Sequence, residues 1–262
     1  MGGNNKVIVL QDRDWNLLRE LPVLRVTDRE QAKCVAGFGS TTRANTRLLA
    51  LTRAGLLQRS FLGTTASGRK ALYSLSKRGA QLVEVPYRGL RLGTDETVVV
   101  NFFVTHQLRI NEIYCTVKYR AIPTPGVQFV QWKSFHESIH TAIPLIPDGY
   151  FELRTPAKTL ATFLEVDLGN ESRTVWRAKI QSYLRYAVSG NFERQFGHVQ
   201  FRTLVVASSE RRLVSLRAAT AELTDKIFWF ATYESITRDG FWSPIWQRPK
   251  DHHPQSLMGN PL

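Results

Sequence analysis

The fold of this chain is decided by two segments, Ile146-Pro147-Asp148-Gly149-Tyr150-Phe151-Glu152-Leu153 and Thr162-Phe163-Leu164-Glu165-Val166-Asp167. Both are rich in residues typical of strands, and Thr155-Pro156-Ala157-Lys158 between them is typical of a turn. If Arg154 pairs with Thr159 across that turn, Asp148 lies opposite Glu165, with Cβ atoms roughly 5 Å apart. Glu165 and Asp167 are two residues apart on one strand, so their side chains share a face. The sequence therefore predicts a hairpin that brings three carboxylates together at one end.

Three neighbouring carboxylates repel one another unless a cation lies among them. Oxygen-only ligands suit a hard divalent ion such as Mg²⁺ or Mn²⁺. Asp148, Glu165 and Asp167 are therefore predicted to bind a metal ion. The alternative is a solvated turn and strand end, because Pro-Asp-Gly is common in turns and Glu-Val-Asp is common at strand ends.

A lysine belongs to the helix that is predicted after the hairpin. Residues 172–187 carry an apolar stripe at helical spacing, made of Trp176, Ile180, Tyr183, Leu184 and Ala187. Lys179 lies on the flank of that stripe, so packing of the helix would bring its ammonium group to the carboxylates. An ammonium beside a metal-bound water stabilises charge that develops on a phosphate. Asp148, Glu165 and Lys179 are the predicted catalytic residues.

This arrangement resembles the core of the PD-(D/E)xK nuclease superfamily. Pro147-Asp148 matches its first signature and Glu165-Val166-Asp167 its second. The last position of the second signature is normally lysine, and Lys179 is the candidate to replace it from the helix, as in some members. The resemblance also implies that Glu112, on a predicted helix over residues 105–113, is an acidic metal ligand.

More narrowly, the chain resembles the replication-relaxation family of plasmids and mobile elements over nearly its whole length. The resemblance rests on His106-Gln107-Leu108, Pro147-Asp148-Gly149, Leu164-Glu165-Val166-Asp167-Leu168-Gly169-Asn170-Glu171-Ser172, Lys179-Ile180-Gln181-Ser182-Tyr183-Leu184 and Pro244-Ile245-Trp246. It implies an α/β (α+β) fold, in which an N-terminal winged helix-turn-helix precedes a restriction-endonuclease-like mixed sheet flanked by helices. It also implies a function in DNA replication or processing.

Positive charge is concentrated in the first third of the chain. Residues 1–92 hold 16 Lys and Arg against 6 Asp and Glu, whereas the rest holds 19 against 16. A basic module joined to a nearly balanced one favours double-stranded DNA as the partner. An anionic membrane is not favoured, because the sequence shows neither a basic amphipathic helix nor a lipidation signal.

The basic module has the pattern of a winged helix. Helices are predicted over residues 12–21, from Thr27 with a capping box to Glu30, and from Ser40 to about Ala54. The start of a recognition helix contacts bases and phosphates. The predicted contacts there are Thr41, Thr42, Arg43, Asn45 and Arg47.

Two strands, over residues 57–62 and 71–75, are predicted to form the wing. Arg59, Arg69 and Lys70 on this hairpin are predicted to contact phosphates. Composition and charge change over residues 86–93, which predicts a winged-helix domain over 1–92, a nuclease-like domain over 93–250 and a flexible tail over 251–262.

The second domain is predicted to add strands over residues 127–135, 201–207 and 227–232, with a helix over 211–223. Arg211, Arg212 and Arg217 on that helix either extend the DNA path or form a solvated face. No apolar run is long enough for a membrane span and no signal peptide is evident, so a cytoplasmic protein is expected.

Two functions from different classes remain open. One is a metal-dependent DNA endonuclease or nickase directed by its winged helix. The other is a DNA-binding initiator or regulator in which the nuclease-like domain is an inactive scaffold. The sequence leaves the oligomeric state open, a homodimer included.

Overall fold

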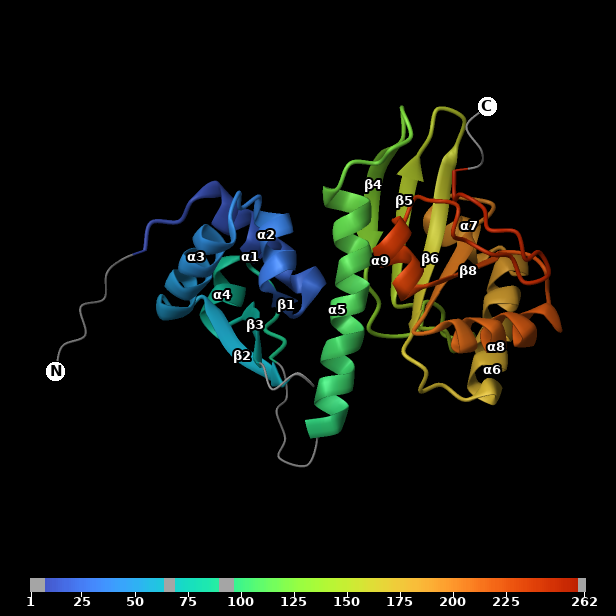
Figure 1. Ribbon diagram of the computed structural model, residues 1–262, viewed down its shortest axis with the longest axis horizontal. Coiled ribbons are helices and arrows are strands. Elements are labelled where there is room, and N and C mark those ends of the chain that lie inside the picture. Colours follow the sequence, from blue (N-terminus) through green and yellow to red (C-terminus); the bar gives the residue numbers. More distant parts are fainter. Residues whose placement is uncertain (1–7, 64–68, 90–96, 259–262) are drawn as a thin grey trace. The chain divides into compact units, whose positions relative to one another are not determined.

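A computed structural model describes residues 8–63, 69–89 and 97–258 of the chain (Figure 1). Those residues form two compact units, Met1–Tyr119 and Arg120–Leu262. The fold is mixed α and β, with a small antiparallel sheet in the first unit and a five-stranded mixed sheet in the second. The α+β class expected from the sequence is confirmed.

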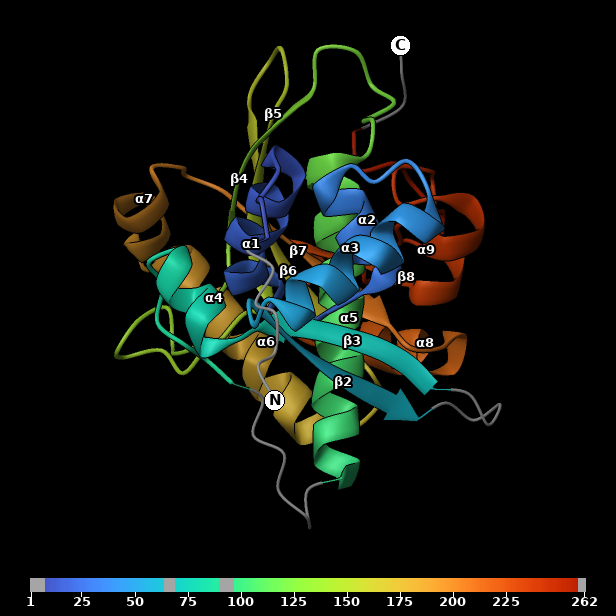
Figure 2. The same ribbon diagram turned by 90° about the vertical axis from the view of Figure 1, so that its left-hand side faces the viewer.

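The first unit begins with three helices and a three-stranded sheet. Its elements are α1 (Asp12–Leu24), β1 (Thr27–Asp28), α2 (Arg29–Ala36), α3 (Thr41–Arg53), β2 (Leu57–Gly63), β3 (Arg69–Leu75), α4 (Lys77–Leu82) and α5 (Thr97–Tyr119). The sheet order is β1-β3-β2, and both pairings are antiparallel. Figure 2 shows α3 beside the β2–β3 hairpin, and the predicted turn of that hairpin, residues 64–68, lies outside the described residues.

Two helix starts follow from capping side chains. The Ser40 hydroxyl accepts from the Arg43 amide at 3.3 Å, as expected, and α3 begins there. The capping box between Thr27 and Glu30 was the wrong prediction for α2. Thr27 belongs to β1, and Asp28 caps the helix by accepting from the Gln31 amide at 2.9 Å.

The boundary between the units falls after Tyr119, later than the change in composition at residues 86–93. The reason is α5, which packs on α1, α2 and β1. The Asn111 amide donates to the carbonyl of Leu24 at 3.0 Å and to that of Val26 at 2.6 Å. The Gln31 amide donates to the Leu108 carbonyl at 2.8 Å. These buried bonds join α5 to the first unit, whereas the sequence placed residues 93–119 in the second domain.

The second unit is one mixed sheet with helices on its flank. Its elements are β4 (Gln128–Lys133), β5 (Gly149–Arg154), β6 (Thr159–Asp167), α6 (Arg173–Val188), α7 (Asn191–Phe196), β7 (Arg202–Ala207), α8 (Glu210–Ala221), β8 (Phe228–Thr232) and α9 (Tyr233–Asp239). The strand order is β4-β5-β6-β7-β8. The first three strands are antiparallel, and β6, β7 and β8 are parallel.

The core of the second unit fills the space between the sheet and helices α6, α7 and α8. Trp176, Ile180 and Tyr183 of the predicted stripe are fully buried there, against Phe163 and Phe228. Burial of such large aromatic side chains is the main stabilising term of this packing. It fixes α6 against β6, and thereby fixes Lys179 against the strand.

The predicted flexible tail is only partly a tail. Gln255 pairs with Trp246 through two backbone hydrogen bonds, at 3.1 and 2.8 Å, and Leu257 is 5% exposed. Residues 251–258 therefore pack onto the second unit. The segment is polar and contains a proline, so its composition did not indicate that the Leu257 side chain would be buried. Residues 259–262 lie outside the described part.

Candidate functional site

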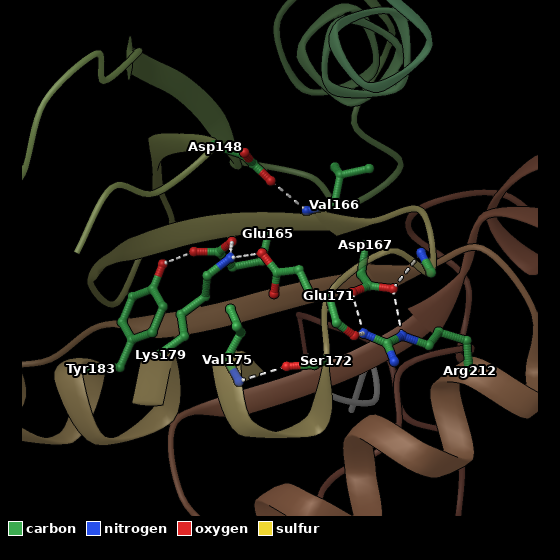
Figure 3. A network of polar contacts seen from close by, with 11 residues as sticks. Asp148, Glu165, Val166, Asp167, Glu171, Ser172, Val175, Lys179, Tyr183 and Arg212 are labelled. Atoms are coloured by element: carbon green, nitrogen blue, oxygen red, sulfur yellow. Dashed lines mark hydrogen bonds and ion pairs between the residues drawn. The ribbon is translucent and has the colours of Figure 1, made fainter. Parts of the chain in front are cut away.

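The β5–β6 hairpin has the predicted register. Arg154 pairs with Thr159 and Gly149 with Leu164, so Asp148 precedes β5 beside the end of β6. The Asp148 carboxylate accepts from the Val166 amide at 2.7 Å (Figure 3). Asp148 is therefore close to the two buried carboxylates of β6, Glu165 and Asp167.

Glu165 lies among polar partners from α6. Its Oε1 accepts from the Tyr183 hydroxyl at 2.6 Å, and its Oε2 lies 3.0 Å from Lys179 Nζ. The same ammonium lies 2.7 Å from Glu171 Oε1 in the loop before α6. The structure thus brings Lys179 to Glu165 (Figure 3). It adds Glu171 and Tyr183 to the site, although the sequence had placed Tyr183 only in the apolar stripe.

Asp167 has a different partner. Arg212, in the first turn of α8, approaches it side-on, with Nε 2.7 Å from Oδ1 and Nη2 2.7 Å from Oδ2. The Gly169 amide also donates to Oδ1 at 2.8 Å, and Arg212 Nη2 donates to the Glu171 carbonyl at 2.7 Å. Two parallel hydrogen bonds between guanidinium and carboxylate form a strong and geometrically specific ion pair. Arg212 is therefore part of the site, and the interpretation of it as part of a solvated face was wrong.

The electrostatics follow from three carboxylates around one ammonium. Burial raises the pKa of Glu165 to about 7, Lys179 lowers it in part, and Asp148 raises it. Burial by itself lowers the pKa of Lys179, but Glu165, Glu171 and Asp148 outweigh that effect and raise it above its usual value. Lys179 is thus a permanent cation, whereas Glu165 titrates near neutral pH.

The predicted metal ligands do not fit a metal centre as they are arranged. Both oxygens of Glu165 accept from protein donors, and Arg212 occupies both oxygens of Asp167. Glu112 lies on α5, in the first unit. Over residues 8–63, 69–89 and 97–258, no group of three or more Asp, Glu, His and Cys side chains is placed to hold an ion. Protein cations balance these carboxylates where the sequence predicted a divalent ion.

The predicted DNA-binding residues differ in exposure. On α3, Thr42 and Arg43 are exposed and Thr41 and Asn45 half-buried. The exception is Arg47, whose Nε donates to Asp14 Oδ1 at 2.8 Å and whose Nη2 donates to the Val9 carbonyl at 2.6 Å. Because Asp14 is completely buried, this guanidinium serves the fold of the first unit, and it is not presented for base contacts as the sequence predicted.

On the hairpin, Arg59, Arg69 and Lys70 are exposed. The Arg59 guanidinium lies over the Phe61 ring, 4.6 Å from its centroid. Lys70 pairs with Asp28 at 2.6 Å, so part of its charge is already balanced. The structure adds Arg13 of α1, which lines a cavity of about 280 Å³ together with Phe38, Thr42 and Arg43. Nothing in the sequence around Arg13 indicated that its side chain would lie beside the start of α3.

A model of the replication-relaxation family matches residues 18–200 of the chain. The chain belongs to the replication-relaxation family. No curated protein and no solved structure matches it.

Membership in the replication-relaxation family supports a role in the replication or relaxation of plasmid or mobile-element DNA. The matched range contains Asp148, Glu165 and Lys179, and it ends before Arg212. Among the described residues no helix is long and apolar enough to span a membrane. The replication-relaxation match therefore covers α6 and its lysine, but not the arginine that completes the site.

The raised pKa of Glu165 predicts a pH-dependent stability. Between its usual value of 4.5 and about 7, the folded protein keeps a proton that the unfolded chain has lost. The free energy of unfolding therefore falls as the pH rises through this window, by up to about 3 kcal/mol for this group. Above the window it does not change further. Urea unfolding of the wild type and of Glu165→Gln at pH 5 and pH 8 measures the effect. Glutamine still accepts from Tyr183 but does not titrate, so the variant should lose less stability over this range.

The matched control is Glu193→Gln, which removes an exposed carboxylate of α7 in the same unit. It should keep the wild-type pH dependence. An equal fall in all three proteins would show that Glu165 ionises at its usual pKa.

Proposed function

We propose that this chain is a duplex-DNA-binding protein of plasmid or mobile-element replication, and that its first unit makes the DNA contacts. The proposal is supported by the element order α1-β1-α2-α3-β2-β3 with the sheet order β1-β3-β2, which is the order expected of a winged helix. It is also supported by the concentration of positive charge in residues 1–92.

The observation that carries the proposal is the exposed basic face formed by α3 and the hairpin. Arg43 is exposed in the first turn of α3, and Arg13 lines the same cavity. Arg59 and Arg69 are exposed on β2 and β3. An arginine at the start of a recognition helix suits the guanine edge in the major groove, and wing arginines suit phosphates.

In the second unit, we propose that ion pairs hold a nuclease-like site in a form that does not cleave DNA. Lys179 and Tyr183 bind Glu165, and Arg212 binds Asp167. Each would have to move before these carboxylates were able to accept a divalent ion. The unit then serves as a scaffold or binding module of the replication machinery.

Metal-dependent DNA cleavage is the second candidate, and one observation favours it. Lys179 lies 3.0 Å from Glu165 with Asp148 close by, which is the grouping of two carboxylates and a lysine that the nuclease resemblance implies. Only this candidate requires Lys179 to separate from Glu165 without loss of the fold.

Supercoiled plasmid incubated with the full chain distinguishes the two candidates. With Mg²⁺ or Mn²⁺, the proposal expects no nicked or linear product above the level found with a chelator. Product that forms only with metal, and that disappears in Lys179→Ala and in Asp148→Ala, would establish the nuclease and overturn the inactive scaffold.

Duplex binding is tested by fluorescence anisotropy of the full chain at several salt concentrations. Arg59→Ala should weaken binding to every sequence and make the slope of log affinity against log salt shallower by about one unit. Arg43→Ala should cost about 1–3 kcal/mol on a preferred site and relax specificity there. Lys70→Ala should have a smaller effect than Arg59→Ala, because Lys70 is paired with Asp28.

The matched control is Arg53→Ala, at the other end of α3 and about 15 Å along the helix from Arg43. It should keep the affinity and the salt slope of the wild type. Equal losses in Arg43→Ala and Arg53→Ala would mean that α3 does not present its start to DNA.

A further inference from the structure

A basic groove lies at the edge of the second unit where strands β6, β7 and β8 begin. It contains a cavity of about 740 Å³, lined among others by Lys158, His198, Arg202, Lys226, Trp229 and Arg248. We call this set the strand-start groove. A second cavity of about 790 Å³ shares Lys158, Leu160, Arg202 and Trp229 with it, so the two adjoin.

The strand-start groove is separate from the carboxylate site. Leu160 and Arg202 stand at the beginnings of β6 and β7, whereas Glu165 and Asp167 stand at the end of β6. Five residues of strand between Leu160 and Glu165 span about 16 Å. Arg202, Lys226, Trp229 and Arg248 also follow the part of the chain that matches the family.

The charge of the groove is strongly one-sided. Lys158, Arg202, Lys226 and Arg248 are four fixed cations, and neither cavity has an aspartate or glutamate among its described lining residues. Three carboxylates lie near the groove without lining either cavity: Glu152 lies 3.2 Å from His198 Nε2, and Asp225 and Asp251 act on Arg248. Such a surface attracts an anion with several charges.

Two arginines are held around one tryptophan in this groove. The guanidinium of Arg202 lies 5.2 Å from the Trp229 ring centroid, and that of Arg248 lies 4.8 Å from it. Each also donates to a carbonyl oxygen, Arg202 to Leu257 at 2.7 Å and Arg248 to Asp225 at 2.8 Å. These contacts leave further N–H groups on each guanidinium. The result is a fixed pair of planar cations.

The two neighbouring arginines of the groove carry like charges. Burial lowers the pKa of Arg202, and the neighbouring Arg248 lowers it further. Ile227, which also lines the groove, has a φ of 52°, a conformation that is strained for a β-branched residue. Backbone strain of this kind gathers at ligand sites. An anion bound between the arginines would relieve their repulsion.

We propose that the strand-start groove binds single-stranded DNA. Phosphates would contact Lys158, Lys226 and the two guanidinium groups, and bases would stack on the guanidinium planes and the exposed part of Trp229. The proposal goes beyond the duplex binding assigned to the first unit, because it gives the second unit its own nucleic-acid contact. Replication and relaxation of DNA both expose such strands.

A strand fits the groove better than other anions. Together the two adjoining cavities exceed the space that a single small ligand needs. An acidic peptide would use the lysines but would leave the planar arginine–tryptophan group without a stacking partner. A free nucleotide has the same chemistry as one unit of a strand, so the experiment must separate the two.

The test measures binding of the full chain to a fluorescent oligothymidylate of about 12 nucleotides by anisotropy, at about 0.15 M salt. The variant Lys158→Glu/Lys226→Glu reverses two exposed charges of the groove. It should weaken single-strand binding about ten-fold or more and change duplex binding less than two-fold. The control Arg211→Glu reverses one exposed charge on α8, which follows the end of β7, and should leave both affinities unchanged.

Three further results decide the proposal. Single-strand binding that persists in Arg43→Ala/Arg59→Ala would support the groove, because that variant impairs the duplex face alone. Single-strand binding that is lost there and kept in Lys158→Glu/Lys226→Glu would overturn it while the proposed function stands. Thymidine monophosphate that competes as strongly as the oligonucleotide would show a nucleotide site and overturn the assignment to a strand.

Discussion

Replacing Arg212 by methionine is expected to destabilise the second unit by about 3–5 kcal/mol. Asp167 is 5% exposed, and its two oxygens accept from Arg212 Nε and Nη2. Methionine keeps much of the side-chain length but removes the charge and the donors, so the variant leaves a buried carboxylate with the Gly169 amide as its remaining described donor. An uncompensated buried charge costs far more than the intact pair contributes.

Urea unfolding of the full chain measures this loss, with hydrogen exchange of peptides from β6 and α8 to assign it to the second unit. The control is Arg211→Met, which changes the exposed neighbour on α8 and should stay within about 0.5 kcal/mol of the wild type. The double variant Asp167→Asn/Arg212→Met should recover most of the stability, because asparagine has no charge and still accepts from Gly169. No recovery in the double variant would mean that Arg212 acts through packing and not through Asp167.

The hairpin was predictable because its information is local. A turn at residues 155–158 and two apolar segments fix the pairing, and the pairing fixes which residues are opposite one another. Periodicity similarly placed Lys179 beside the buried stripe of α6, and the structure brings its ammonium to Glu165. These inferences needed only residues within about twenty positions of one another.

The predictions that were wrong concern contacts between segments that are far apart in the sequence. Arg212 reaches Asp167 across 45 residues that include α6, α7 and β7, and no spacing in the sequence announces that contact. It also bears on the resemblance to the nuclease superfamily. In the nuclease pattern a lysine follows the strand glutamate, whereas here the position is Asp167 and α8 supplies a cation to it. Compared with that pattern, the charge at this position is reversed, and a cation from another element balances it.

The domain boundary failed for the same reason. Composition changes at residues 86–93, but α5 is joined to the first unit by hydrogen bonds from Asn111 and Gln31 that span about eighty residues. The apolar composition of α5 resembled that of the second unit. Composition describes a segment by itself, and it does not indicate which unit the segment packs against.

The second large effect concerns Arg47, which the sequence placed among the base contacts. Arg47→Met is expected to destabilise the first unit by about 3–5 kcal/mol, because Asp14 is completely buried and would lose its cation. Asp14 also accepts from the Gln11 amide at 2.7 Å at the start of α1, so the pair joins the start of α1 to the middle of α3. Weaker DNA binding by this variant would then follow from unfolding of the basic face.

Arg43→Met is the matched control, since it makes the same change one helical turn earlier on α3 at an exposed position. It should keep the wild-type stability within about 0.5 kcal/mol and still lose duplex affinity. Urea unfolding and hydrogen exchange of peptides from α1 and α3 separate the two effects, and anisotropy gives the affinity under conditions where both variants are folded. If Arg47→Met is as stable as the wild type and binds duplex DNA as poorly as Arg43→Met, its guanidinium contacts DNA and the structural role is wrong. If it is unstable but binds normally when folded, Arg47 organises the face on which Arg43 contacts the DNA.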